Sequence, residues 1–297
     1  MLARSILYRR WGRRFAAALS PLLLAACQSQ PATEARPAMW LVEDADTHIY
    51  MLGTMHALPA GTDWRGGKVA AAIDAADELM LELSPRELAA AGAVFQELAP
   101  RSAPLAMSAR LPGKALAGYR AIEGDADLGG DELDDWAVLV MMGQRVAQQV
   151  ELSPADGVEA GLTAAFRKAG KPIGGLESAR TQLMLFETLD PATQRALLVR
   201  AAENSASAER DVLSMTDAWS RGDANALARV VNEDVDEVPA ARKAIITDRN
   251  RRWSDWVKAR LDKPGTVLMA VGAGHLVGQD SLPAMLAAEG YKVTRVQ

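Results

Sequence analysis

The sequence predicts an α/β fold: a central mixed β-sheet flanked by helices, with a large helical insertion that caps the strand ends. Three observations lead to it. Short apolar runs at residues 49–52, 78–83 and 267–271 have the length and composition of buried strands. Longer amphipathic segments lie between them, as in sheets whose strands are joined by crossover helices. The first and last runs each lead into a Gly-x-x-His pattern, although the chain has only three histidines.

Residues 1–27 have the composition of an export signal. Five arginines precede a short apolar stretch, and Leu24-Ala25-Ala26-Cys27 resembles a bacterial lipobox, in which the cysteine is acylated. The alternative is an ordinary signal peptide that happens to contain a cysteine. The residue after the cysteine is Gln28 rather than an aspartate, as in lipoproteins that are sorted to the outer membrane. We therefore expect a lipid-anchored protein of the cell envelope that faces the periplasm.

Residues 28–38 are polar, contain two prolines and lack periodicity, which predicts a flexible tether. The folded domain is then expected at residues 39–297, without a disulfide because Cys27 is the only cysteine. Residues 1–27 carry five arginines and no acid, so the rest of the chain has 28 basic and 38 acidic residues, a net charge of −10. This balance argues against a nucleic-acid-binding surface. The sequence does not indicate an oligomeric state.

The sequence of the first part of the domain predicts a β-hairpin, followed by a helix and a strand. Residues 39–43 and 48–52 flank an Asp-rich turn, which is typical of a β-hairpin. A helix is expected at about residues 68–76, before the strand at 78–83. Ser84 has the features of a helix N-cap. Beyond it, residues 85–150 are helical in pattern, and the strongest runs are 107–122 and 133–150.

The second part begins with a helix at 153–168 and a short strand at 171–177 that ends at Glu177. Such a helix–turn–strand unit is typical of an α/β crossover. No strand is expected in residues 178–262, which we interpret as a helical layer over the strand ends. The helices expected there are 192–203, 209–221 and 240–261, and the elements expected after them are a strand at 265–271, a helix at 281–289 and a strand at 292–296.

The two Gly-x-x-His patterns are Gly53 to His56 and Gly272 to His275. Glycine permits a sharp turn and a close backbone approach, and in α/β sheets ligands bind at the carboxyl ends of the strands. We therefore expect both histidines at one site although they are far apart in the sequence. Two further strands end near Glu82 and at Glu177, which are expected at the same edge.

Two imidazoles with one or two carboxylates suit a divalent transition metal such as zinc, manganese, cobalt or iron. A metal lowers the pKa of bound water, and a free carboxylate beside it can act as a general base. Each of these residues could instead have a purely structural role. Each histidine alone would be an ordinary hydrogen-bonded residue, Glu82 could be a surface carboxylate before a turn, and Glu177 could interact only with a helix dipole.

With their flanking strands and Glu82, the two histidine motifs resemble the TraB/PrgY/GumN family. That family is related to the Tiki proteases and, more distantly, to erythromycin-esterase-like and ChaN-like proteins. The resemblance covers about residues 39–297. Further matches are residues 174–178 followed by Gln182, and Arg249-Asn250 before Trp253.

The resemblance implies an α/β fold with both Gly-x-x-His turns in one site. In the Tiki branch, two histidines and a glutamate are linked to manganese- or cobalt-dependent peptide cleavage. Carried over, His56 and His275 would be metal ligands and Glu82 a ligand or general base. Arg249 and Asn250 would line the site from the helical layer. Glu159 stands where the family pattern has an aspartate, and it is assigned no role.

The sequence thus supports three hypotheses. The first is an envelope-anchored, metal-dependent hydrolase that acts on a peptide amide bond, with Glu177 as a further candidate ligand. The second is a binding module without turnover, for a small ligand, a peptide or haem. The third is a scaffold lipoprotein whose histidines are structural.

Overall fold

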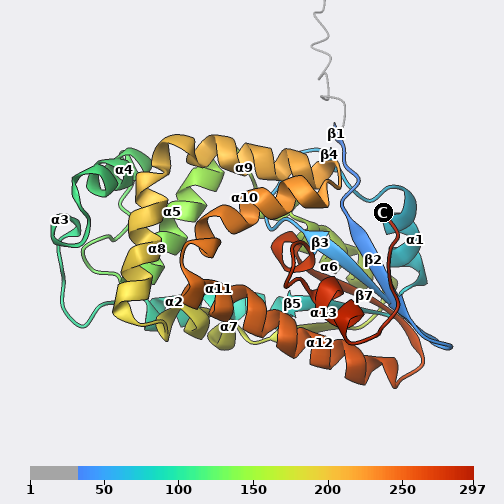
Figure 1. Cartoon of the computed structure of the whole chain (residues 1–297). Coiled ribbons are helices and arrows are strands. Elements are labelled where there is room, and N and C mark those ends of the chain that lie inside the picture. Colours follow the sequence, from blue (N-terminus) through green and yellow to red (C-terminus); the bar gives the residue numbers. More distant parts are fainter. Residues whose placement is uncertain (1–32) are drawn as a thin grey trace, which may run out of the picture. The chain divides into compact units, whose positions relative to one another are not determined.

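A six-stranded mixed sheet lies at the centre of the fold (Figure 1). Its strand order is β6 (Ile173–Glu177), β5 (Glu78–Leu83), β7 (Gly265–Gly272), β3 (Thr47–Thr54), β2 (Met39–Glu43) and β8 (Val293–Arg295). The first four strands are parallel, whereas β2 is antiparallel to both β3 and β8. The predicted α/β class and mixed sheet are confirmed.

The computed structural model describes residues 33–297, apart from the side chains of Thr33 and of residues 232–235. The export signal predicted at residues 1–27 lies outside the described residues. Within residues 33–297, no helix is both long enough and apolar enough to cross a membrane.

Strand β7 is buried on both faces because its side chains alternate between two apolar cores. Leu268 and Ala270 belong to one core, and Val267, Met269 and Val271 belong to the other. This alternation is the period of an extended strand, and it explains why β7 reads as a continuous apolar run. β7 therefore occupies the middle of the sheet, between β5 and β3.

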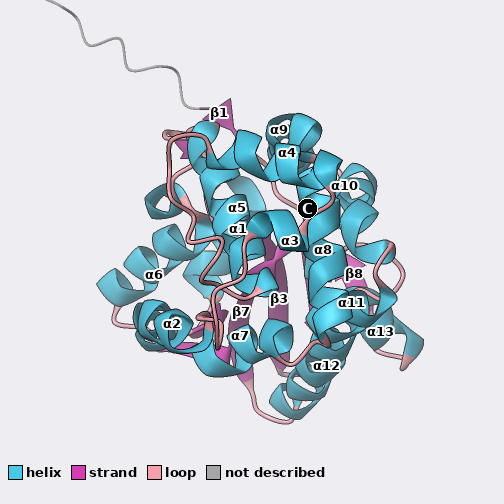
Figure 2. Ribbon diagram, turned by 90° about the vertical axis from the view of Figure 1, so that its left-hand side faces the viewer, coloured by secondary structure: helices cyan, strands magenta, loops and turns pink. Residues whose placement is uncertain are grey.

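Helices cover both faces of the sheet (Figure 2). On one face, the apolar sides of α1 and α6 join the first core through Val69, Leu162 and Phe166. On the other face, α12 and α13 join the second core through Trp253 and Leu286. The bounds of these helices are α1 (Gly67–Ala75), α6 (Val158–Ala169), α12 (Asp248–Leu261) and α13 (Leu282–Ala288).

Most of the remaining helices form the predicted cap, and α4, α5 and α8 gather at the left of Figure 1 around a core of their own. The expected helices at 192–203, 209–221 and 240–261 correspond to α8, α9 and the segment from α11 to α12. The bounds are α2 (Pro85–Leu98), α3 (Met107–Arg110), α4 (Gly113–Glu123), α5 (Asp135–Gln149), α7 (Ala179–Glu187), α8 (Pro191–Glu203), α9 (Ser205–Ser220), α10 (Ala224–Asp236), α11 (Pro239–Arg242), the π-helix η2 (Lys243–Thr247), and the 3-10 helices η1 (Pro154–Asp156) and η3 (Ala273–Leu276).

Three local predictions differ from the structure. The helix expected at 153–168 is divided into η1 and α6, because the backbone of Gly157 between them is extended. The run at 107–122 is not one helix, because Pro112 separates α3 from α4 and cannot donate a backbone hydrogen bond. The described part of the tether is packed against the domain. Its strand β1 (Thr33–Glu34) pairs in parallel with β4 (Thr62–Asp63), and Ala35 is buried. The small apolar side chains of Ala35 and Ala38 permit this packing. The sequence did not predict it because most of the neighbouring residues are polar.

Candidate functional site

The carboxyl ends of the four parallel strands meet at one edge of the sheet. Glu177 ends β6, Glu82 lies one residue before the end of β5, Gly272 ends β7 and Thr54 ends β3. Thr54 pairs with Gly272, and Leu83 pairs with Glu177. This register places the two acids and the two Gly-x-x-His turns side by side.

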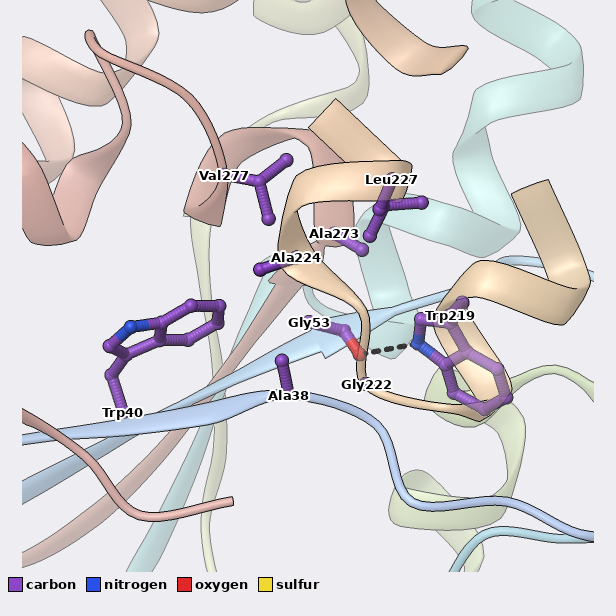
Figure 3. Close-up of a pocket in the computed structure, with 9 residues that line it drawn as sticks. All are labelled: Ala38, Trp40, Gly53, Trp219, Gly222, Ala224, Leu227, Ala273 and Val277. Carbon is purple, nitrogen blue, oxygen red and sulfur yellow. Dashed lines mark hydrogen bonds between the residues drawn. The ribbon is translucent and has the colours of Figure 1, made fainter. Parts of the chain in front are cut away.

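The two turns pack against each other just behind this edge. A Cβ atom on Gly53 would lie 3.1 Å from the Cβ of Ala273, so glycine permits the close approach. The carbonyl oxygen of Gly53 accepts a hydrogen bond of 2.9 Å from the indole nitrogen of Trp219 (Figure 3). The cavity drawn there is only about 10 Å³ and is lined mostly by apolar residues. It is a packing gap between the turns.

His56, Glu82 and His275 surround a single point above Gly272. A Cβ atom on Gly272 would lie 3.1 Å from Glu82 Oε1, 3.7 Å from His275 Cδ2 and 3.8 Å from His56 Nε2. The structure therefore brings the two histidines and the acid together. They differ in exposure, because the His56 side chain is 70% exposed whereas Glu82 and His275 are buried.

The imidazole of His56 is oriented by Glu159, at the start of α6. Its Nδ1 lies 2.7 Å from Glu159 Oε1, and Thr54 Oγ1 donates to the same oxygen. The start of α6 is fixed on the turn because the Val158 amide donates to the carbonyl of Met55. The negative charge of Glu159 raises the pKa of His56 to about 9. His56 is thus a cation at neutral pH, with Nε2 directed toward the site.

Glu82 is held as a carboxylate by three hydrogen bonds. Its Oε1 accepts from the Gly272 amide at 2.7 Å, and its Oε2 accepts from Gln182 at 2.8 Å and from Arg249 at 2.6 Å. Burial alone would raise the pKa of Glu82, but the positive charge of Arg249 and the nearby histidines lower it to about 2. A carboxylate with so low a pKa is a weak general base.

Arg249, on the first turn of α12, lies between Glu82 and Glu177. Its Nη2 donates to both acids, and its Nε is 3.1 Å from Glu177 Oε2. Arg252 also donates to Glu177, at 3.3 Å. The side chains of Arg249 and Glu177 are 6% and 3% exposed, so the ion pair between these two residues is shielded from water. Glu177 thus forms ion pairs with two arginines, Arg249 and Arg252.

His275 is neutral, and its tautomer is fixed by its neighbours. Its Nδ1 lies 2.8 Å from Asn250 Oδ1, and the Asn250 amide nitrogen donates to the Asp280 carbonyl. Asn250 therefore offers its oxygen to the ring, so Nδ1 carries the proton and Nε2 has the free lone pair. That Nε2 is 2.9 Å from Nη1 of Arg249, which donates to it. Burial lowers the pKa of His275 to about 3.

A model of the TraB/PrgY/GumN family matches residues 38–295. The chain belongs to this family. No curated protein and no solved structure matches the chain. The family resemblance seen in the sequence is therefore confirmed, and it extends over nearly the whole of the described region.

Three residues of this TraB/PrgY/GumN site had no role in the sequence analysis: Glu159, Gln182 and Trp253. Glu159 contacts His56 across 103 positions, and no local pattern marks such a contact. The signal available in the sequence was that Glu159 stands where the family pattern has another acid, an aspartate. Gln182 and Trp253 were noted only as family matches.

The divalent metal implied by the family does not fit these residues as they are arranged. The lone pair of His275 Nε2 and both oxygens of Glu82 already accept hydrogen bonds from protein donors. Among the side chains that the structure describes, no three from His, Cys, Asp or Glu are placed to hold one metal ion.

Proposed function

We propose that the protein is a hydrolase of the cell envelope that cleaves a peptide amide bond, with His56 as the group that transfers protons. One observation carries this proposal: an exposed imidazole is oriented through Nδ1 by the partly buried acid Glu159 and directs Nε2 to the strand edge where Glu82 and Gly272 lie. Such an imidazole–carboxylate pair is the usual arrangement of an acid–base histidine.

In the reaction, water adds to the carbonyl carbon of the substrate and the C–N bond breaks. The imidazolium of His56 gives its Nε2 proton to the leaving nitrogen, and the resulting imidazole takes a proton from the water. The products are a carboxylic acid and an amine, and His56 returns to its starting state. Glu159 stabilises the cationic form and keeps the ring in one orientation.

The buried network beside His56 acts in positioning. Glu82 accepts a hydrogen bond from the Gly272 amide. This contact holds the end of β7 against the end of β5. Arg249 links Glu82 to His275 and so fixes the second Gly-x-x-His turn. These contacts keep the residues beneath the bound substrate rigid. A rigid site favours alignment of the substrate amide with the His56 ring.

The proposed location is the outer membrane, on its periplasmic side, through a lipid on Cys27. The Leu24 to Cys27 pattern and Gln28 support this proposal. Replacing Cys27 by serine should move the exported protein from the membrane fraction to the soluble periplasmic fraction. A Cys27→Ser protein that stays in the membrane fraction would contradict lipid attachment.

The hydrolase proposal is tested with the purified full chain and a library of fluorogenic peptides, with either chelator or added Mn²⁺, Co²⁺ or Zn²⁺. We expect cleavage by the wild type and a fall in kcat of about 100-fold or more in His56→Asn. The matched control is His48→Asn, because His48 is a half-exposed strand residue in β3. Activity should decline as the pH rises through about 9, because His56 then loses its proton.

Two outcomes count against the proposal. Equal cleavage by the wild type and by His56→Asn would remove His56 from the chemistry. No cleavage of any peptide under any of the metal conditions would remove the hydrolase and leave the binding module as the better hypothesis.

A further inference from the structure

The guanidinium of Arg249 lies among three groups that the sequence predicts to be metal ligands. Its Nη2 is 2.6 Å from Glu82 Oε2 and 2.8 Å from Glu177 Oε2, and its Nη1 is 2.9 Å from His275 Nε2. Arg249 and Glu82 are 5% and 7% exposed. A single planar cation thus joins two acids and an imidazole whose side chains are buried.

A metal on His275 would have to displace this guanidinium. A neutral imidazole has one free lone pair, and the Asn250 contact fixes it on Nε2. Metal–nitrogen bonds are about 2.1 Å long and lie along that lone pair. The same direction is already taken by Nη1 of Arg249. A divalent ion there would also stand beside the positive charge of the guanidinium.

The charges of the network are balanced without a divalent ion. Glu82 and Glu177 carry two negative charges, and Arg249 and Arg252 carry two positive charges. His275 adds no charge, because its Nε2 accepts a hydrogen bond from Arg249 while its Nδ1 carries the proton shared with Asn250. Adding a dication would leave an uncompensated charge in a buried place, which costs several kcal/mol.

Trp253 keeps the guanidinium in position from the other side. The Arg249 guanidinium carbon lies 4.5 Å from the centroid of the Trp253 ring, within the range of a cation–π contact. Trp253 is itself 2% exposed and belongs to the second apolar core. Arg249 is therefore held by hydrogen bonds at its edge and by an indole at its face, which restricts its withdrawal.

We propose that the Arg249 guanidinium occupies the position at which a divalent cation would join Glu82, Glu177 and His275, so that the protein holds this centre without a metal. This inference does not depend on the hydrolase proposal. A chain that binds no metal and cleaves no peptide would keep the inference and lose the proposed reaction.

The test compares metal binding by the full-length wild type and by variants of Arg249. After treatment with chelator and dialysis, thermal unfolding is followed with and without Mn²⁺, Co²⁺ or Zn²⁺, and metal content is measured by elemental analysis. A ligand at about 100 times its dissociation constant would raise Tm by several degrees. We expect no such shift and no stoichiometric metal in the wild type.

Arg249→Ala should reverse this result, because it leaves two buried acids and an imidazole around an empty place. We expect this variant to show a rise in Tm of several degrees with added metal. If it is unfolded alone, recovery of its circular dichroism on metal addition gives the same information. Arg249→Lys is the matched control, since it keeps a positive charge there and should not gain metal binding.

The inference is overturned if the wild type holds about one metal per chain and His275→Ala loses it. It is also overturned if Arg249→Ala is folded and shows no response to any of the three metals, because the guanidinium would then not be what occupies the position.

Discussion

The indole ring of Trp253 lies 4.5 Å from the imidazole of His275, centroid to centroid. The ring also faces Arg249, so it forms the apolar boundary of the charged network. His56 is on the open side of the same site, with most of its side chain exposed. The two histidines therefore have opposite environments. His275 stays neutral to low pH and His56 stays charged to high pH, and this contrast leads to the predictions that follow.

The first prediction concerns the pKa of His56. In an NMR titration, His56 should titrate near pH 9 because Glu159 favours its charged form. Glu159→Gln should move this pKa back toward the ordinary value of about 6.5. The matched control is Glu132→Gln, which removes an exposed acid in the cap and should leave His56 unchanged. A His56 that titrates normally in the wild type would contradict the ion pair.

The second prediction concerns stability in acid. The pKa of His275 is about 3 when folded, so between pH 6.5 and 3 the unfolded chain binds one more proton than the folded chain. The free energy of unfolding should therefore fall as the pH is lowered from 7 to 4, by roughly 3 kcal/mol from this residue. Below about pH 4.5, Glu82 acts in the same direction because its folded pKa is about 2.

Urea unfolding at a series of pH values measures this loss. His275→Asn should be less stable at pH 7 but should lose much of the dependence between pH 6.5 and 4, because the titrating group is absent. His48→Asn is the control and should keep the wild-type slope. A His275→Asn slope equal to that of the wild type would show that His275 does not contribute.

The third prediction concerns Gly272, whose φ of −47° any residue adopts. Alanine there would add a methyl group 3.1 Å from Glu82 Oε1 and within 4 Å of both imidazoles. We expect Gly272→Ala to shift the NMR signals of His56 and His275 and to lower the free energy of unfolding by about 1 kcal/mol.

Gly143→Ala is the matched control for that change. Gly143 lies in α5, and a Cβ atom there meets nothing within 4 Å. The substitution should leave the histidine signals unchanged and raise the free energy of unfolding by about 0.5–1 kcal/mol, because glycine is unfavourable inside a helix. If the histidine signals of Gly272→Ala matched those of Gly143→Ala, the two rings would not share the space above Gly272.

Strand positions were predictable from the sequence because each buried strand has a local pattern. The apolar run at 267–271 and the glycine that follows it are enough to place β7 and the turn to His275. The convergence of the two histidine turns also follows, since parallel strands bring their carboxyl ends to one edge. These features follow from local patterns along the chain together with the general rule for parallel strands.

The charged contacts of the site were not predictable, because they depend on pairs that are far apart. Arg249 reaches Glu82 across 167 positions, and Glu159 reaches His56 across 103. Arg249 was expected near the site, but a sequence shows neither the direction of its guanidinium nor which acceptors it fills. A list of suitable ligands therefore could not distinguish a metal centre from an arginine-centred network.

The pairing of β3 with β7 has a consequence for biogenesis. Residues 47–54 pair with 265–272, and β7 also pairs with β5, so the middle strand comes from the last part of the chain. A nascent polypeptide that has not yet supplied residue 265 has β3 and β5 without the strand between them, and long-range parallel pairing of this kind is slow. During synthesis those apolar strand edges stay open, so this molecule should need a chaperone until its C-terminal segment has been made.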